Sequence, residues 1–197
     1  MYIKEEVNNT QIVEKSRFIA YLRPCFSEDE YKDFLKEIKK KHYDATHVCS
    51  GFINDSIKRS SDDGEPSGTA GVPILSVLEK NNLNHTAALV VRYFGGIKLG
   101  AGGLIRAYGS AVSNALSIAK LVEDVEYPKY ELVLSYDLAN KVNHLLDKEG
   151  INVIKEYGEN VKFTYLSDNE KLIDKIAEIT SGIKPNYIGK EVIQKDV

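Results

Sequence analysis

The spacing of hydrophobic residues changes several times along the first 120 residues, and each change marks the border of a predicted element. Strands are predicted where β-branched and aromatic residues alternate with polar ones or form an apolar run, and helices where apolar residues recur every three or four positions. Glycine, proline and aspartate are frequent in the loops between them. The predicted elements are strands at residues 2–7 and 10–23 with a turn at Asn8 and Asn9, a helix at 27–42, a strand at 46–53, a loop at 60–71, a helix at 70–80, a strand at 86–94, a glycine-rich turn at 95–103 and a helix from there to about 119.

Some residues in this part of the chain have a chemical as well as a structural interpretation. Ser27, with Glu30 three positions later, has the pattern of a capping box that begins a helix. Thr69 is placed to cap the helix that follows it, and the exposed amides of that helix would attract an anion. His47 and Cys49 would share one strand face and could supply two metal ligands. Because no second His/Cys pair lies at zinc spacing, we interpret His47 as a hydrogen-bonded strand residue near a site.

The composition changes near Val125, where glycines become rare and charges of both signs return. From there the periodicity predicts the order β-α-β-β-α-β, which is the split order of a ferredoxin-like domain. We therefore expect an α+β protein with two domains, at residues 1–124 and 125–197. The predicted elements of the second domain are a strand at 127–135, a helix ending at 150, strands at 151–157 and 160–166, a helix ending at 182 and a strand at 186–193.

The composition of the 197 residues is that of an ordinary globular protein, with 43% hydrophobic and 28% charged residues. The N-terminus has no apolar signal-peptide core, and no apolar run is long enough to span a membrane, so a cytoplasmic location is expected. Cys25 and Cys49 are expected to be buried, reduced thiols. The net charge of −3 does not by itself require a nucleic-acid partner.

The distribution of charge indicates more than the net charge. The segment 86–119 contains no Asp or Glu, yet it carries Arg92, Lys98 and Arg106. A second basic pair, Lys58 and Arg59, precedes an acidic loop at Asp62, Asp63 and Glu65. Either small residues exclude charges of both signs from a packed segment, or this segment forms a cationic surface for a polyanion.

Glycine is concentrated in the same region, because nine of the fourteen glycines lie between Gly64 and Gly109. Such density indicates turns with positive φ, or backbone that must come close to another group. The order of strand, glycine-rich turn and helix is also the order that binds phosphate at a helix N-terminus. However, the stretch beginning at Gly100 lacks the third glycine of G-x-G-x-x-G, and the sequence contains no G-x-x-x-x-G-K-[ST].

Two long motifs carry a resemblance to a known family. They read D-D-G-E-P-S-G-T-A-G-V-P-I-L at residues 62–75 and V-R-Y-F-G-G-I-K-L-G-A-G-G-L-I-R-A-Y at residues 91–108. Together with S-R-F-I-A at 16–20 and A-T-H at 45–47, they resemble the IMPACT/YigZ family of uncharacterised bacterial proteins and eukaryotic translation regulators. The resemblance covers about residues 1–120. The remainder is similar to the small ferredoxin-like domain appended in bacterial members.

This resemblance implies a fold and a functional context. The first domain should have the β-α fold of the second domain of ribosomal protein S5, which also occurs as domain IV of elongation factor G. The second should be similar to domain V of that factor. Eukaryotic members bind the activator of the kinase that phosphorylates initiation factor two. The resemblance implies no catalytic residue, metal or cofactor.

Our main functional hypothesis is a translation-associated binding protein that contacts RNA, the ribosome or a translation factor through the glycine-rich basic face, with no membrane partner. Basic residues would neutralise phosphates, and aromatic residues could stack on bases. The expected contact residues are Lys58, Arg59, Arg92, Tyr93, Lys98, Arg106 and Tyr108. The expected anion loop comprises Gly68, Thr69, Gly95, Gly96, Gly100, Gly102 and Gly103. Phe94 is expected in the core.

Two alternatives stay open at this point. In the first, the acidic loop holds Mg²⁺ and the chain is an enzyme acting on a phosphorylated or nucleotide substrate. A competing interpretation is that Asp62 and Asp63 bond backbone amides in the turn and pair with Arg92 or Arg106. In the second alternative, the chain is a protein–protein adaptor that binds no nucleic acid.

Overall fold

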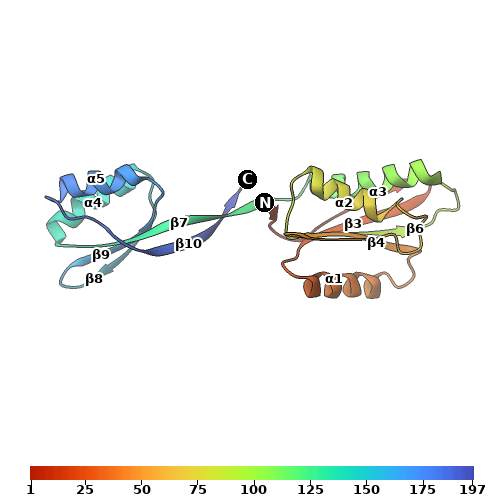
Figure 1. Ribbon diagram of the computed structural model, residues 1–197, viewed down its shortest axis with the longest axis horizontal. Helices are drawn as coiled ribbons and strands as arrows, with labels where there is room; N and C mark the ends of the chain where they lie inside the picture. Colours follow the sequence, from red (N-terminus) through yellow and green to blue (C-terminus); the bar gives the residue numbers. More distant parts are fainter. The chain divides into compact units, whose positions relative to one another are not determined.

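The computed structural model describes residues 1–197, which divide into two structural units (Figure 1). The first unit contains residues 1–123 and 196–197, and the second contains residues 124–195. Strand β7 (Leu121–Leu134) passes through the border between them. None of the helices is both long and apolar enough to cross a membrane.

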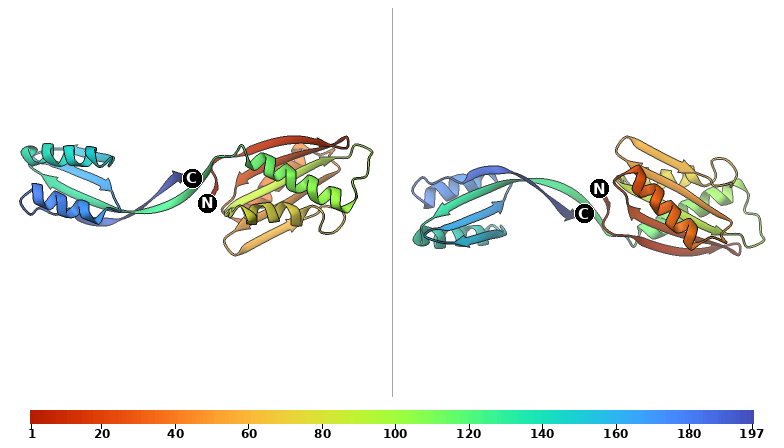
Figure 2. Two further views of the ribbon diagram at one scale, coloured as in Figure 1. Left: turned by 90° about the horizontal axis from the view of Figure 1, so that it is seen from above. Right: turned by 90° about the horizontal axis from the view of Figure 1, so that it is seen from below.

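The first unit is built on a five-stranded antiparallel sheet in the order β2-β3-β6-β4-β5. Helices α2 and α3 cover one face of this sheet and α1 covers the other, as the two views in Figure 2 show. The elements are β1 (Tyr2–Ile3), β2 (Val7–Val13), β3 (Ser16–Pro24), α1 (Glu28–Lys41), β4 (His47–Asn54), β5 (Ile57–Ser61), α2 (Gly71–Lys80), β6 (Thr86–Tyr93) and α3 (Gly100–Leu116). The predicted apolar strand at 86–94 is therefore the central strand, β6.

Two apolar cores sandwich this sheet, which explains why its inner strands alternate only weakly in sequence. Phe18 and Leu22 of β3 pack towards α2 and α3. Ile19 and Tyr21 of the same strand pack towards α1. A strand that is covered on both faces needs apolar residues at odd and even positions alike, so its pattern becomes a continuous run.

The predicted cap of the first helix is confirmed, since Ser27 Oγ accepts a hydrogen bond from the Glu30 amide at 3.1 Å. The predicted N-terminal turn was wrong. Asn8 lies inside β2, and the hairpin turns at Glu14 and Lys15, whose φ values are 46° and 64°. Asparagine favours such left-handed conformations, but here two long charged residues adopt them because the β2–β3 register requires it.

The sequence pattern does not predict strand β5 (Ile57–Ser61), whose last two residues fall in the expected loop and whose first three fall in no expected element. Its sequence, I-K-R-S-S, is polar because β5 is an edge strand with most of its side chains exposed. The second unit follows the predicted β-α-β-β-α-β order. Its elements are the later part of β7, α4 (Tyr136–Lys148), β8 (Val153–Tyr157), β9 (Val161–Leu166), α5 (Glu170–Ile179) and β10 (Asn186–Asp196).

The second unit has its own apolar core between its sheet and its two helices. Strand β9 contributes Phe163, and α4 contributes Leu146, both of which are almost fully buried. Strand β7 begins earlier than predicted because its first residues pair with β1, and β10 also pairs with β7. Separate cores imply that each unit has a stability of its own.

We expect Leu146→Ala to lower the free energy of unfolding of the second unit by about 2–5 kcal/mol, because it opens a cavity in that core. Hydrogen exchange followed by mass spectrometry should show faster exchange in β9 and unchanged exchange in β6. Ile38→Ala, in the core beneath α1, is the matched control and should give the reverse result. Equal effects of either variant on both strands would show that the units unfold as one.

Candidate binding site

A pocket of about 430 Å³ opens in the first unit where β4 begins and β6 ends, beside the first turn of α3. Antiparallel pairing brings the start of β4 and the end of β6 to the same end of the sheet, and His47 is the register partner of Arg92. The polar side chains that line the pocket are Thr46, His47, Glu65, Arg92 and Lys98. The apolar ones are Pro66, Phe94, Leu99, Ala101 and Leu104.

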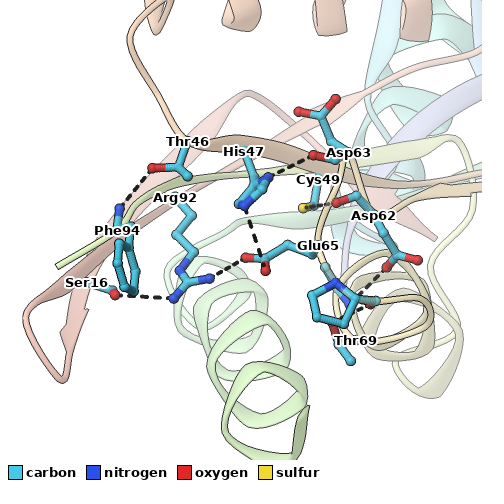
Figure 3. A network of polar contacts seen from close by, with 12 residues as sticks. Ser16, Thr46, His47, Cys49, Asp62, Asp63, Glu65, Thr69, Arg92 and Phe94 are labelled. Carbon is cyan, nitrogen blue, oxygen red and sulfur yellow. Dashed lines mark hydrogen bonds and ion pairs between the residues drawn. The ribbon is translucent and has the colours of Figure 1, made fainter. Parts of the chain in front are cut away.

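The base of the pocket is formed by a buried ion pair (Figure 3). Arg92 Nη1 donates to Glu65 Oε1 at 2.6 Å, and the two side chains are 6% and 4% exposed. Tyr108 of α3 donates its hydroxyl to the same Glu65 oxygen at 2.7 Å. Burial raises the pKa of the Tyr108 hydroxyl, so this group keeps the proton that it donates to Glu65. Two donors on one carboxylate oxygen offset part of the cost of burying its charge.

His47 lies next to this pair, and its orientation is determined by the acidic loop. Its Nδ1 is 2.8 Å from the main-chain oxygen of Asp63. A carbonyl oxygen can only accept, so Nδ1 carries the proton and Nε2 of the neutral ring is an acceptor. Nε2 lies 3.8 Å from Glu65 Oε2. The prediction that His47 is a hydrogen-bonded strand residue is confirmed, and its ring lines the pocket.

Arg92 is not fully satisfied by its partners. Its Nη2 reaches Ser16 Oγ only at 3.4 Å, and its buried Nε has no hydrogen-bond partner. The guanidinium carbon lies 5.4 Å from the centre of the Phe94 ring. A buried N–H without a partner costs about 1–3 kcal/mol, so the burial of Arg92 is only partly offset by its hydrogen bonds.

The acidic loop is held by its own carboxylates. Asp62 accepts hydrogen bonds from the amides of Gly68, Ala70 and Gly71, which are 2.8 to 3.0 Å away. Asp63 accepts from the Val48 amide, and from Lys39, both at 2.7 Å. The prediction that the aspartates bond backbone amides in the turn is confirmed for Asp62, whereas the side chain of Asp63 bonds an amide of β4. The prediction that these aspartates pair with Arg92 or Arg106 was wrong, because the acidic partner of Arg92 is Glu65.

These contacts also change the expected metal and anion sites. No group of three or more His, Cys, Asp or Glu side chains converges to hold a metal ion, and the carboxylates of the acidic loop are bonded to donors of the protein. Thr69 does not cap α2; its hydroxyl donates to the Pro66 carbonyl at 2.6 Å. The anion expected near Gly68 and Thr69 is the carboxylate of Asp62 itself.

Only part of the expected basic surface is exposed. Arg92 and Tyr108 are buried, so neither can meet a partner at the surface. Lys58 and Arg59 form ion pairs at the other end of the sheet. Lys58 is the register partner of Ile53, six residues along β4 from His47, or about 20 Å away. Lys58 and Arg59 are already paired because the edge strand β5 places them next to acidic residues of α2 and α1.

In the segment 86–119, which contains no acidic residue, two basic side chains remain available to contact a partner. Lys98 and Arg106 are exposed and form no ion pair. Tyr93 is half-buried, bonds His42 and lies under the guanidinium of Arg17, 4.3 Å from its ring centre. Phe94 was expected in the core, but 47% of it is exposed at the pocket. Its position at the end of β6, beyond the sheet pairing, explains the error.

The glycines near the pocket allow turns and close packing of the chain. Gly96 and Gly100 have positive φ values of 86° and 68°. A Cβ at Gly95 would lie 2.1 Å from the Lys15 carbonyl, so the β2–β3 turn and the 94–99 loop pack backbone to backbone. Gly102 and Gly103 lie in the first turn of α3.

The fold and the site define a class: a mixed α/β protein of two units with a preformed pocket in the first. Residues 14–116 match the family of the Impact N-terminal domain. IMPACT family member YvyE of Bacillus subtilis is 45% identical over 188 residues, covering 91% of this chain and 86% of the relative. IMPACT family member YigZ of Escherichia coli is 37% identical over 139 residues, covering 68% of each.

A crystal structure of a hypothetical protein is similar over 96% of this chain and 97% of its own, with 30% identity and a TM-score of 0.60. The match to the family domain and the two curated relatives agree with one another. This chain belongs to the IMPACT family. The resemblance inferred from the two long motifs is thus confirmed.

The carboxylate of Asp62 should make stability depend on pH. Burial opposes its ionisation, but three backbone hydrogen bonds outweigh that effect and lower the pKa of Asp62 below its ordinary value of 3.8. Its stabilising contribution is therefore complete above about pH 4 and is lost as the pH falls through the folded-state pKa. We expect Asp62→Asn to lower the free energy of unfolding by about 1–3 kcal/mol at pH 7.

The measurement is urea denaturation between pH 3 and 7. The difference between wild type and Asp62→Asn should shrink as the pH falls below 4. Asp33→Asn, at an exposed position on α1, is the control and should differ little from wild type at any pH. A difference that does not change with pH would contradict the role given to the Asp62 charge.

Substitution by alanine should affect stability in opposite directions at a glycine that packs against backbone and at a glycine that lies in a helix. Gly95→Ala should lower the free energy of unfolding by about 1–3 kcal/mol, because the new Cβ overlaps the Lys15 backbone. Gly102→Ala should raise it by up to about 1 kcal/mol, because that position is helical and open. Chemical denaturation of both variants tests this, and a neutral Gly95→Ala would be the contrary result.

Proposed function

We propose that this chain is a translation-associated binding protein whose first unit contacts RNA, the ribosome or a translational-control partner through the surface around the pocket. The observation that carries the proposal is that Lys98 and Arg106 are exposed and unpaired beside the pocket, in a segment that contains no acidic residue. The resemblance to a family with eukaryotic translation regulators supplies the context. A cytoplasmic location is part of this proposal, because translation takes place there.

The local surface is suited to a chain of phosphates more than to a single ion. A second hollow of about 490 Å³ lies on the other side of the 94–99 loop, and Lys98 and Leu99 line both hollows. Arg106 lines the second one, where Glu14 is the acidic residue. Two cations spaced along adjoining hollows can contact successive phosphates of one strand.

The fold supports this proposal at a finer level. We propose that the first unit has the fold of the second domain of ribosomal protein S5, and that the second unit is a ferredoxin-like domain similar to domain V of elongation factor G. The β-α-β-β-α-β element order supports the latter assignment. Both folds belong to proteins of the translation machinery, but function depends on the site and not on the fold.

The affinity for RNA should be modest and depend strongly on salt, because few cations are available and the net charge is −3. We expect the double variant Lys98→Glu with Arg106→Glu to weaken binding of a single-stranded RNA by at least about tenfold at low salt. The slope of log K against log salt should fall by about 1.4, since each phosphate contact contributes about 0.7 for single strands.

Fluorescence anisotropy with the full chain and a labelled oligonucleotide measures both quantities. The control is Lys36→Glu with Lys40→Glu, which makes the same change in charge on exposed positions of α1, on the opposite face of the sheet. If both double variants weaken binding equally, the effect is due to net charge and the proposed surface is wrong. Absence of RNA and ribosome binding by the wild type would leave the adaptor alternative.

A further inference from the structure

The pocket is built for a ligand that is neutral at one end and anionic at the other. We propose that it binds one unstacked nucleobase, so that this chain recognises single-stranded and not duplex RNA. The inference rests on the proposed function and deepens it. It depends on the chemistry of the pocket base, of the pocket wall and of the rim, which differ from one another.

The base of the pocket does not favour an anion. The charge of Arg92 is neutralised by Glu65, which is itself almost fully buried. A phosphate placed here would meet a carboxylate in a medium that screens charge poorly. The group of this pair that no hydrogen bond uses, and that belongs to a side chain lining the pocket, is an acceptor, Glu65 Oε2. Nucleobase edges carry N–H donors that can bind such an acceptor without bringing a negative charge of their own.

The wall of the pocket is suited to a flat ring. Phe94 is half exposed at the pocket, with apolar neighbours at Leu99 and Leu104. Unstacked bases in RNA complexes stack on aromatic side chains of this kind. A volume of about 430 Å³ is within the usual range for small-ligand sites. A base in a duplex could not reach these groups, because its edge is paired and its faces are stacked.

The rim of the pocket supplies the anion site that the base of the pocket lacks. Lys98 lines the pocket next to Gly100 and Ala101, in the first turn of α3. That turn has no capping side chain and no acidic residue. The helix amides therefore have a partial positive charge that is not offset, and a phosphate attached to the bound nucleoside would lie against them.

The test compares three RNA ligands for the full chain by anisotropy: a ten-nucleotide single strand, an oligomer of equal length without bases, and a blunt duplex. We expect the single strand to bind at least about tenfold more tightly than the other two. Phe94→Ala should remove this preference and leave the weaker, salt-dependent binding. Phe26→Ala is the matched control, since Phe26 is equally exposed and lies at the opposite end of the sheet.

A second variant tests the contact between the edge of the nucleobase and Glu65. Glu65→Gln exchanges an acceptor for a donor at the pocket base, so it should alter the ranking of the four homopolymers. If all three ligands bind equally and the Lys98→Glu with Arg106→Glu variant loses binding, the RNA surface stands and the nucleobase pocket is wrong. If no RNA binds to the wild type, the proposed RNA function fails together with this inference.

Discussion

The buried pair of Arg92 and Glu65 is the interaction on which the site depends. It joins the central strand β6 to the loop at 62–70, and the Tyr108 hydroxyl adds α3 to the same carboxylate. Removing one partner of such a pair typically costs about 3–5 kcal/mol, because the other charge is left uncompensated in the interior. An apolar pair could stabilise the same contact at least as well, so stability alone does not explain these residues. Their position at the base of the pocket means that this end of the pocket has no net charge from the pair.

The pocket is preformed because its walls are fixed by contacts that no ligand needs to supply. Asp62 holds the amides that begin α2, while Asp63 holds the start of β4 and orients His47 through its carbonyl. On the other side, the 94–99 loop packs against the β2–β3 turn at Gly95. A ligand entering such a site loses its own freedom but does not have to order the loops. The acidic loop therefore acts through geometry, and its charges are already used by the protein.

Much of the fold could be predicted from the sequence, because the spacing of apolar residues along a strand or helix reflects which of its faces are buried. The apolar run of β6 and the Ser27 cap are local signals, and both were read correctly. The turn at Glu14 and Lys15 could not be read, because its conformation follows from strand register and not from residue preference. Similarly, the sequence placed Glu65 and Arg92 in two separate motifs, 27 residues apart. Which acid meets which base depends on the order of strands in the sheet, and no spacing rule contains that information.

The same reasoning changes the meaning of the segment without acids. Its three cations suggest a uniformly positive surface, but Arg92 is neutralised internally and only Lys98 and Arg106 face solvent. The glycines beside them form turns and close contacts, and the amides of α3 are exposed because no side chain caps them. Among the residues that line the pocket, the unpaired positive charge therefore lies at the rim, on Lys98, while the ion pair at the base of the pocket has no net charge. This separation favours a ligand whose charged and uncharged parts are adjacent, as they are in a nucleotide, over a polyanion recognised by charge alone.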